Sequence, residues 1–242
     1  MTRAGLGRGR LALAALVLLL PAAGHAGALS ILPSRLSVQP DGRPGTLRLE
    51  NLSDQPSLVQ VEAFAWSDSD QPDALTATKD LIALPAVFAL PGGAEQIIRV
   101  AFRRPATLAQ ETSYRVIITE VPQEANRVPG GVNLAVRMSL PVFVTPPGAA
   151  PSTAWRLERD GSSGVRLVAQ NGGTAHVRMT DLVVVDDAGR PVFERKQPAY
   201  VLAGEEQSWR IALDRLKGAR NLRVRAESNV GALDVAVAAA GS

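Results

Sequence analysis

The most informative segment of this sequence is Gly130-Gly131-Val132-Asn133-Leu134-Ala135-Val136-Arg137-Met138-Ser139-Leu140-Pro141-Val142-Phe143-Val144. Apolar side chains recur at every second position from Val132 to Val142. A period of two is typical of a β-strand with one apolar face. The strand is longer than the usual length of about five or six residues. Pro141 has no N–H to donate, which predicts that this end of the strand lies at a sheet edge.

A long apolar strand at a sheet edge has two interpretations. It is the last strand of a β-sandwich domain, covered by the rest of the fold. Alternatively, the exposed edge offers its apolar side chains to a partner that lacks a strand. The remainder of the sequence has to distinguish between the two.

The first 26 residues have the features of a secretory signal peptide. Arg3, Arg8 and Arg10 precede a short apolar core at Leu11–Leu20, and small residues near Ala26 provide a cleavage site. The apolar run is too short for a good transmembrane span. We therefore expect a secreted, soluble protein without membrane insertion, which is periplasmic if the source is a Gram-negative bacterium.

Removal of this segment changes the charge of the chain. The full sequence has 26 basic and 23 acidic residues. Three arginines and no acid leave with residues 1–26, so the mature chain is near neutral, which argues against nucleic acid as a partner. The sequence contains no cysteine, which excludes disulfides and thiolate metal sites.

Short alternating segments separated by turn signals follow the signal peptide, with no sustained helical period. About seven such strands precede the stiff linker Pro146-Pro147-Gly148-Ala149-Ala150-Pro151, and a second set extends from Trp155 to Ala238. The sequence predicts an all-β protein of two immunoglobulin-like β-sandwich domains, residues 27–146 and 147–242. We expect a boomerang-like arrangement with an interdomain cleft, which is a favoured place for binding.

The sequence does not point to catalysis, a metal or a cofactor. His176 is the single histidine of the mature chain, and alone it forms neither a metal site nor a Ser-His-Asp relay. It is interpreted as an ordinary strand or turn histidine. Asp186-Asp187 and Glu205-Glu206 lie beside glycines and are interpreted as solvated turn residues rather than acid–base pairs. The scattered tryptophans are expected in the cores or at a domain interface: Trp66, Trp155 and Trp209.

Several segments, taken in their order, resemble the periplasmic chaperones of chaperone–usher pilus assembly. The resemblance covers nearly the whole mature chain and is strongest in the first domain. The segments are Pro33-Ser34-Arg35-Leu36, residues 84–90, Ile98-Arg99-Val100, residues 111–116, Glu120-Val121-Pro122 and residues 132–144. The sequence Ser139-Leu140-Pro141-Val142-Phe143-Val144 is similar to that of the archaic, Csu-type branch, whose subunits resemble spore coat protein U.

The resemblance implies a non-enzymatic mechanism. A pilus subunit, or a spore-coat-U-like subunit, is a sandwich without its last strand, and the chaperone fills the groove before an outer-membrane usher receives the subunit. The donated side chains are expected to be Val132, Leu134, Val136 and Met138. Each buried aliphatic side chain contributes roughly 1.5–3 kcal/mol. Four of them contribute on the order of 6–12 kcal/mol before the cost of association.

The family also anchors the C-terminal carboxylate of its pilus subunit between the two domains, with an arginine of the first strand and a lysine of the last. Arg35 matches the arginine, whereas the lysine position falls at Pro141, or at Ser139 if a gap is allowed. An antiparallel hairpin centred near Arg127 predicts Arg115 opposite about Ser139. A guanidinium binds a carboxylate with two hydrogen bonds, so Arg35 and Arg115 are the expected anchor. Lesser candidates are Arg99 and Arg137.

Two other functions remain open. A secreted two-domain adhesion protein, or a structural pilus component, should carry an N-terminal donor extension and lack its own last strand. This sequence has a complete strand set in each half and a short mature lead, which disfavours that alternative. A carbohydrate-active enzyme on a sandwich scaffold would require a carboxylate pair in the cleft, and the sequence does not indicate one.

Overall fold

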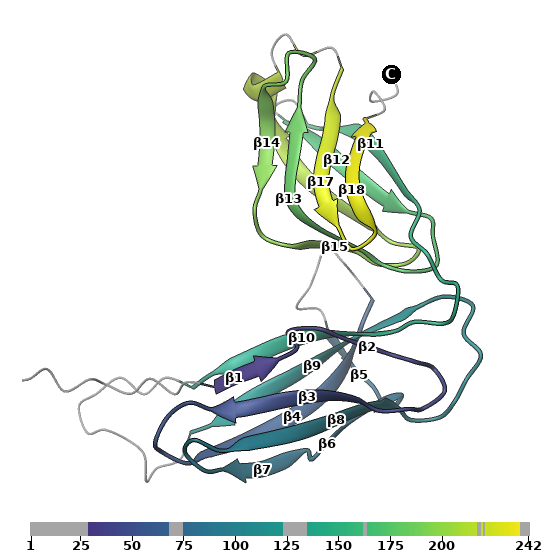
Figure 1. Ribbon diagram of the computed structural model, residues 1–242. Coiled ribbons are helices and arrows are strands. Elements are labelled where there is room, and N and C mark those ends of the chain that lie inside the picture. Colours follow the sequence, from purple (N-terminus) through teal and green to yellow (C-terminus); the bar gives the residue numbers. More distant parts are fainter. Residues whose placement is uncertain are drawn as a thin grey trace, which may run out of the picture.

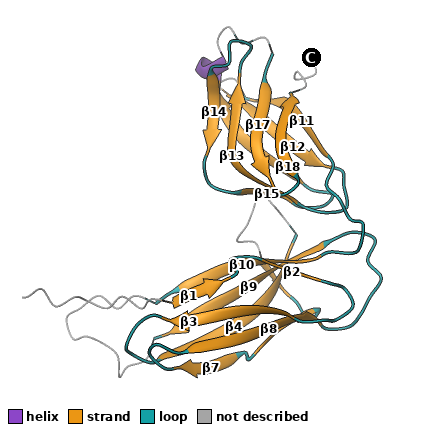
Figure 2. Ribbon diagram, in the orientation of Figure 1, coloured by secondary structure: helices purple, strands orange, loops and turns teal. Residues whose placement is uncertain are grey.

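The computed structural model describes residues 29–67, 75–122, 135–161, 164–216, 219 and 221–237. These residues form two β-sandwiches that meet at an angle (Figure 1). The protein is all-β, and the short 3-10 turn η2 (Leu213–Leu216) lies in the second sandwich (Figure 2). Within the described ranges, no helix has the length and hydropathy needed to cross a membrane.

The first sandwich contains two sheets built from the strands up to Val144. One sheet has the order β1 (Leu29–Leu32), β3 (Gly45–Asn51), β8 (Glu95–Phe102), β6 (Leu81–Leu84). The other has the order β2 (Leu36–Val38), β10 (Arg137–Val144), β9 (Thr112–Val121), β4 (Ser57–Trp66), β5 (Leu75–Ala77), and β7 (Val87–Leu90) also pairs with β4. The pairing of β2 with β10 is parallel. The neighbouring strands β10 and β9 are antiparallel along their whole pairing.

Alternation of apolar and polar residues explains why these strands form a sandwich. The burial of β3 alternates along the strand, and its Leu47 and Leu49 are fully buried. Leu140, Val142 and Val144 of β10 enter the same core. Each strand thus directs one face into the core, as the period of two predicts.

The second sandwich begins at Thr153. Its three-stranded sheet has the order β11 (Thr153–Asp160), β12 (Gly164–Asn171), β16 (Glu206–Ala212). The facing sheet has the order β14 (Pro191–Arg195), β13 (Val177–Val185), β17 (Arg223–Ser228), β18 (Gly231–Ala236), and β15 (Ala199–Val201) also pairs with β13. Trp155 and Trp209 stack in this core with ring centres 5.9 Å apart.

The prediction that the Pro141 end of the strand lies at a sheet edge is wrong for Val142–Val144, whereas Pro141 itself pairs only with β9. β10 pairs with β9 from Arg137 to Val144, and on its other side it pairs with β2 from Val142 to Val144. The end of β10 that follows Pro141 is therefore an interior part of the sheet. β2 begins at Leu36, opposite Val142, so the missing N–H falls beside the end of the short strand. Among the described strands, it is the N-terminal half of β10 that lies at an edge.

Asp186 also differs from the prediction of a solvated turn residue. Its side chain is buried, and its carboxylate accepts hydrogen bonds from the backbone N–H groups of Ala188 and Arg190. The Arg190 guanidinium donates to it as well. Asp186 therefore organises the turn between β13 and β14 from within, because its two oxygens satisfy the donors of the loop.

Candidate functional site

Pro141 lies between two arginines across one sheet. Its partner in the β9–β10 register is Arg115, whereas Ser139 pairs with Ile117. Arg115 thus faces a position of β10 that is two residues beyond Ser139, the predicted partner. On the other side, Leu36 is level with Val142 in the parallel pairing, so Arg35 precedes β2 at the level of Pro141. The two candidate anchor residues therefore flank Pro141, one of the two positions at which the family resemblance predicts a lysine.

Arg115 is held on an aromatic ring. The central carbon of its guanidinium lies 3.8 Å from the ring centre of Trp66, a buried residue at the end of β4. A cation over the face of tryptophan is stabilised by the ring quadrupole. The N–H groups of a guanidinium lie in its own plane, so the stack occupies the face of the group and orients its fork.

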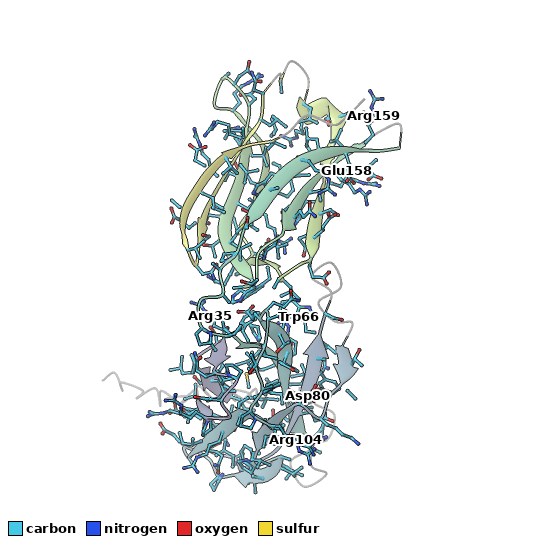
Figure 3. The ribbon with its side chains drawn as sticks, turned by 90° about the vertical axis from the view of Figure 1, so that its right-hand side faces the viewer. Arg35, Trp66, Asp80, Arg104, Glu158 and Arg159 are labelled. Carbon is cyan, nitrogen blue, oxygen red and sulfur yellow. The ribbon has the colours of Figure 1, made fainter. Side chains whose placement is uncertain are left out.

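Arg35 occupies an exposed bend between β1 and β2. The bend follows the cis peptide bond Leu32-Pro33, where the chain leaves one sheet of the sandwich and enters the other. Figure 3 shows Arg35 and Trp66 at the level where the two sandwiches meet. Arg35 thus lies on a bend and Arg115 inside a strand, and the sheet places both at the level of Pro141. We call Arg35, Pro141 and Arg115 the arginine row.

The face of the sheet that carries this row contacts the second sandwich. Phe143 lies two residues after Pro141 on β10, therefore on the same face, and is fully buried. It forms an apolar cluster with Trp66 and Leu202, against which Leu75 and Tyr200 pack. The ring centres of Trp66 and Tyr200 are 5.6 Å apart in an edge-to-face contact. Trp66, which was expected either in a core or at an interface, thus lies at the interface.

Glu111 joins the two sandwiches through hydrogen bonds of its buried carboxylate, which the sequence did not predict. Its carboxylate accepts from the backbone N–H of His176 at 3.0 Å and lies 2.7 Å from the His176 Nδ1. The Thr145 hydroxyl donates to the other oxygen at 2.8 Å. His176 also stacks on Phe143, with ring centres 3.6 Å apart. His176 is therefore a residue of the domain junction rather than an ordinary strand histidine. The family resemblance of residues 111–116 was the one sequence signal that pointed to Glu111.

The predicted donor residues fall on the part of β10 that leaves the core. Val136 and Met138 are half-buried, and Met138 packs against the core of the first sandwich. Leu140, the next residue on this face, is buried in that core. Val132 and Leu134 lie outside the described residues. The apolar face of β10 thus changes from core side chains to partly exposed ones at Met138.

The lesser candidates do not join the row of Arg35 and Arg115. Arg99 lies on β8, in the other sheet, where it pairs with Thr46 and Leu84. Arg137 lies on β10 and pairs with Thr119, four residues before Pro141. It is exposed and lies on the same sheet face as Arg35 and Arg115, but not at the level of Pro141.

A cavity of about 250 Å³ opens at the junction, on the side of Trp66. Residues of both sandwiches line it, including Tyr114, Leu202 and the acidic Asp80 and Glu205. Burial above all, and then the charge of Asp80, raises the pKa of Tyr114. Because no basic side chain lines the described part of this cavity, it does not favour a carboxylate. In the described residues, no group of three or more histidine and acidic side chains could hold a metal ion.

Comparison with known proteins identifies the family. Residues 28–150 match the pili and flagellar-assembly chaperones, in the PapD N-terminal domain. The chain belongs to this family. No curated protein matches the sequence of this chaperone.

Solved structures share the fold of the chaperone at low sequence identity. A chain of the CsuC–CsuE chaperone–tip adhesion subunit pre-assembly complex of Acinetobacter baumannii is 17% identical, with a TM-score of 0.69, over 88% of this chain and 100% of that chain. The SafA pilin–SafB chaperone complex of Salmonella enterica matches at 17% identity and a TM-score of 0.60, over 88% and 98%. The YadV chaperone matches at 18% and 0.61, over 86% and 98%.

Proposed function

We propose that this chaperone holds pilus subunits in the periplasm by donor-strand complementation and delivers them to an outer-membrane usher. The observation that carries the proposal is the row Arg35, Pro141, Arg115 on the sheet face that meets the second domain. This row shares a strand with the donor residues, so one element serves both contacts. The sequence of residues 139–144 favours subunits of the archaic Csu type, similar to spore coat protein U.

The anchor half of the proposal rests on charge and geometry. The subunit would present its terminal carboxylate between Arg35 and Arg115, beside Pro141. Arg115 would bind it with its fork while stacked on Trp66. A charge-assisted, bidentate pair of this kind is among the stronger hydrogen-bonded contacts in proteins. The arginine from β9 would replace the lysine that β10 lacks.

The donor half rests on the continuity of one apolar face. Leu140 and Val142 complete the core of the chaperone itself. Val136 and Met138, earlier on the same face, would complete the core of a subunit, together with Val132 and Leu134. An extended strand added to an open sheet gains backbone hydrogen bonds as well as these side-chain contacts.

The similar structures support the class of partner. One is a complex of a chaperone with a tip adhesion subunit, and another is a complex of a chaperone with a pilin. We infer the same class of partner here, a pilus subunit that ends in a free carboxylate.

The test is a double-mutant cycle with a pilus subunit from the genome that encodes this chaperone. Arg115→Ala and amidation of the terminal carboxylate of that pilus protein should each weaken binding, by about 2–5 kcal/mol if the ion pair is desolvated. Together they should weaken it little further, because both remove the same contact. Arg48→Ala, an exposed arginine of the other sheet, is the matched control. Additive losses would exclude Arg115 as the anchor, and a wild type that captures no subunit would exclude the function.

A further inference from the structure

Glu120 is a carboxylate on a strand face that is otherwise apolar. Tyr114, Val116 and Ile118 alternate along β9 and enter the core of the first sandwich. Glu120 is the next residue on that face, and it is half-buried. A charged group at the end of a core-facing row is stable only with hydrogen-bond partners.

Its partners come from the strands on either side of β9. The buried Ser57 of β4 donates its hydroxyl to Glu120 Oε1 at 2.7 Å. On the other side, the Val136 N–H donates to Glu120 Oε2 at 3.4 Å. The Glu120 N–H donates to the Val136 carbonyl at 2.8 Å. The carboxylate therefore links β4 to the start of β10.

The pairing between Glu120 and Val136 departs from a regular ladder. In an antiparallel hydrogen-bonded pair, the two residues exchange both N–H···O bonds. Here the Val136 N–H is directed to the Glu120 side chain, and β10 begins at the next residue, Arg137. The side chain thus takes the donor that would otherwise have continued the ladder.

Pro122 follows directly after the end of β9, two positions beyond Glu120. The register of the hairpin would set Pro122 opposite residue 134, in the next hydrogen-bonded position. Proline has no N–H, so it cannot supply a ladder bond there. Glu120 and Pro122 therefore limit pairing at two successive positions.

We propose that Glu120 and Pro122 are positioning residues that end the pairing of β9 with β10 at Val136. They fix the point at which the chaperone strand leaves its own sheet and becomes available to a subunit. This inference rests on the proposed function, because a donor strand needs a free edge to offer to a subunit. A strand that continued to pair with β9 would have that edge already hydrogen-bonded and could not offer it to a partner.

The experiment compares wild-type chaperone with Glu120→Leu, Pro122→Ala and the double variant, using the same pilus subunit as the probe. Three quantities are measured: the unfolding midpoint of the free chaperone, amide hydrogen exchange over residues 133–137, and the dissociation rate of the subunit. Glu120→Gln is the conservative variant, because its amide oxygen still accepts the Val136 N–H. Glu95→Leu, on an exposed position of β8, is the matched control.

We expect the double variant to exchange more slowly over residues 133–137, to unfold at the same or a higher midpoint, and to release the subunit at least about tenfold faster. Glu120→Gln and Glu95→Leu should behave as the wild type. A merely structural Glu120 would instead give a lower midpoint with unchanged exchange. Pro122→Ala removes no buried contact, and it should slow exchange over residues 133–137 less than the double variant does.

Two results would overturn the inference: slower exchange with unchanged subunit release, or no change in exchange in any of the variants. Both are distinct from failure of the proposed function, in which the wild type itself would capture no subunit. The exchange measurement on the free chaperone is independent of the subunit.

Discussion

At the scale of single residues, Arg115 makes a side-chain contact that suits a guanidinium better than a lysine ammonium. Its guanidinium stacks on Trp66 at 3.8 Å, and its partner across the sheet is Pro141. An ammonium group is a point charge with a strong hydration shell, whereas a guanidinium is flat and is easily placed on an aromatic face. We therefore expect subunit binding to depend on the shape of this cation as well as on its charge.

We expect Arg115→Lys to weaken subunit binding although the charge is kept. Loss of the stack on Trp66 should cost about 0.5–2 kcal/mol, which corresponds to a roughly 2- to 30-fold rise in the dissociation constant. Titration of the subunit with each variant measures this change. Arg99→Lys, in the other sheet, should leave the dissociation constant unaltered. Equal affinity of Arg115→Lys and the wild type would show that charge alone is sufficient.

Asp186 makes a pH-dependent contribution to stability. The N–H of Arg190, followed by its guanidinium and by the N–H of Ala188, holds the pKa of this carboxyl below its usual value of 3.8. A lowered pKa in the folded state means that the charged form is favoured by folding. The contribution is therefore complete above the unfolded-state pKa near 4 and is lost as the pH falls through the lower folded value.

We expect Asp186→Asn to destabilise the second sandwich at pH 6 and to have a smaller effect at pH 3. Urea unfolding at the two pH values measures the difference from the wild type. The exposed neighbour Asp187 provides the control, because Asp187→Asn should change the unfolding free energy little at either pH. A destabilisation by Asp186→Asn that grows toward low pH would contradict this account.

At the scale of the element, β10 divides into two parts along one apolar face. From Leu140 onward its side chains belong to the core of the chaperone, with β9 on one side and β2 on the other for the last three residues. Before Leu140 the side chains of this apolar face, Val136 and Met138, are only half-buried, and the strand has one described neighbour. The two parts should therefore respond differently to the same substitution.

We expect Leu140→Ala to lower the free energy of unfolding by about 2–5 kcal/mol, because it opens a cavity in a packed core. Val136→Ala should cost folding much less, since the side chain is half-buried, but should reduce the amount of subunit that co-purifies. Urea unfolding and co-purification, carried out on both variants, separate the two effects. Similar destabilisation by both would mean that Val136 is an ordinary core residue.

At the scale of the whole molecule, the angle between the sandwiches is held by apolar and polar contacts together. Phe143, Trp66 and Leu202 form the apolar part. Glu111 forms the polar part through Thr145 and His176, and its own N–H donates to the Thr174 carbonyl at 2.8 Å. Since Phe143 and Pro141 share a strand face, the same contacts orient the second domain relative to the arginine row.

We expect Glu111→Ala to loosen the junction while each sandwich stays folded. The buried His176 N–H would lose its acceptor, at a cost of about 1–3 kcal/mol for a buried group left unsatisfied, and the half-buried Thr145 hydroxyl would lose its partner. Small-angle X-ray scattering should then show a broader range of interdomain distances, and subunit affinity should fall. Glu95→Ala serves as the exposed control. An unchanged scattering profile would show that the apolar cluster alone fixes the angle.

The sequence by itself determined the all-β class, the alternating core faces and the resemblance that led to Arg35 and Arg115. These features are local, since a period of two, a proline-rich linker and a short motif are each contained in a few consecutive residues. It did not determine the register of the β9–β10 hairpin. A shift of two residues keeps every side chain on its face, so the hydrophobic pattern cannot detect it.

Only the tertiary structure decided which distant residues meet. The end of β10 from Val142 to Val144 is interior because β2, which lies about a hundred residues earlier in the chain, pairs beside it. The buried contact of Glu111 with His176 joins residues 65 apart. Asp186 is buried because the donors of its own turn surround it. Contacts of this kind depend on how sheets and domains pack, and a polar residue at such a place has the same local sequence signature as one in water.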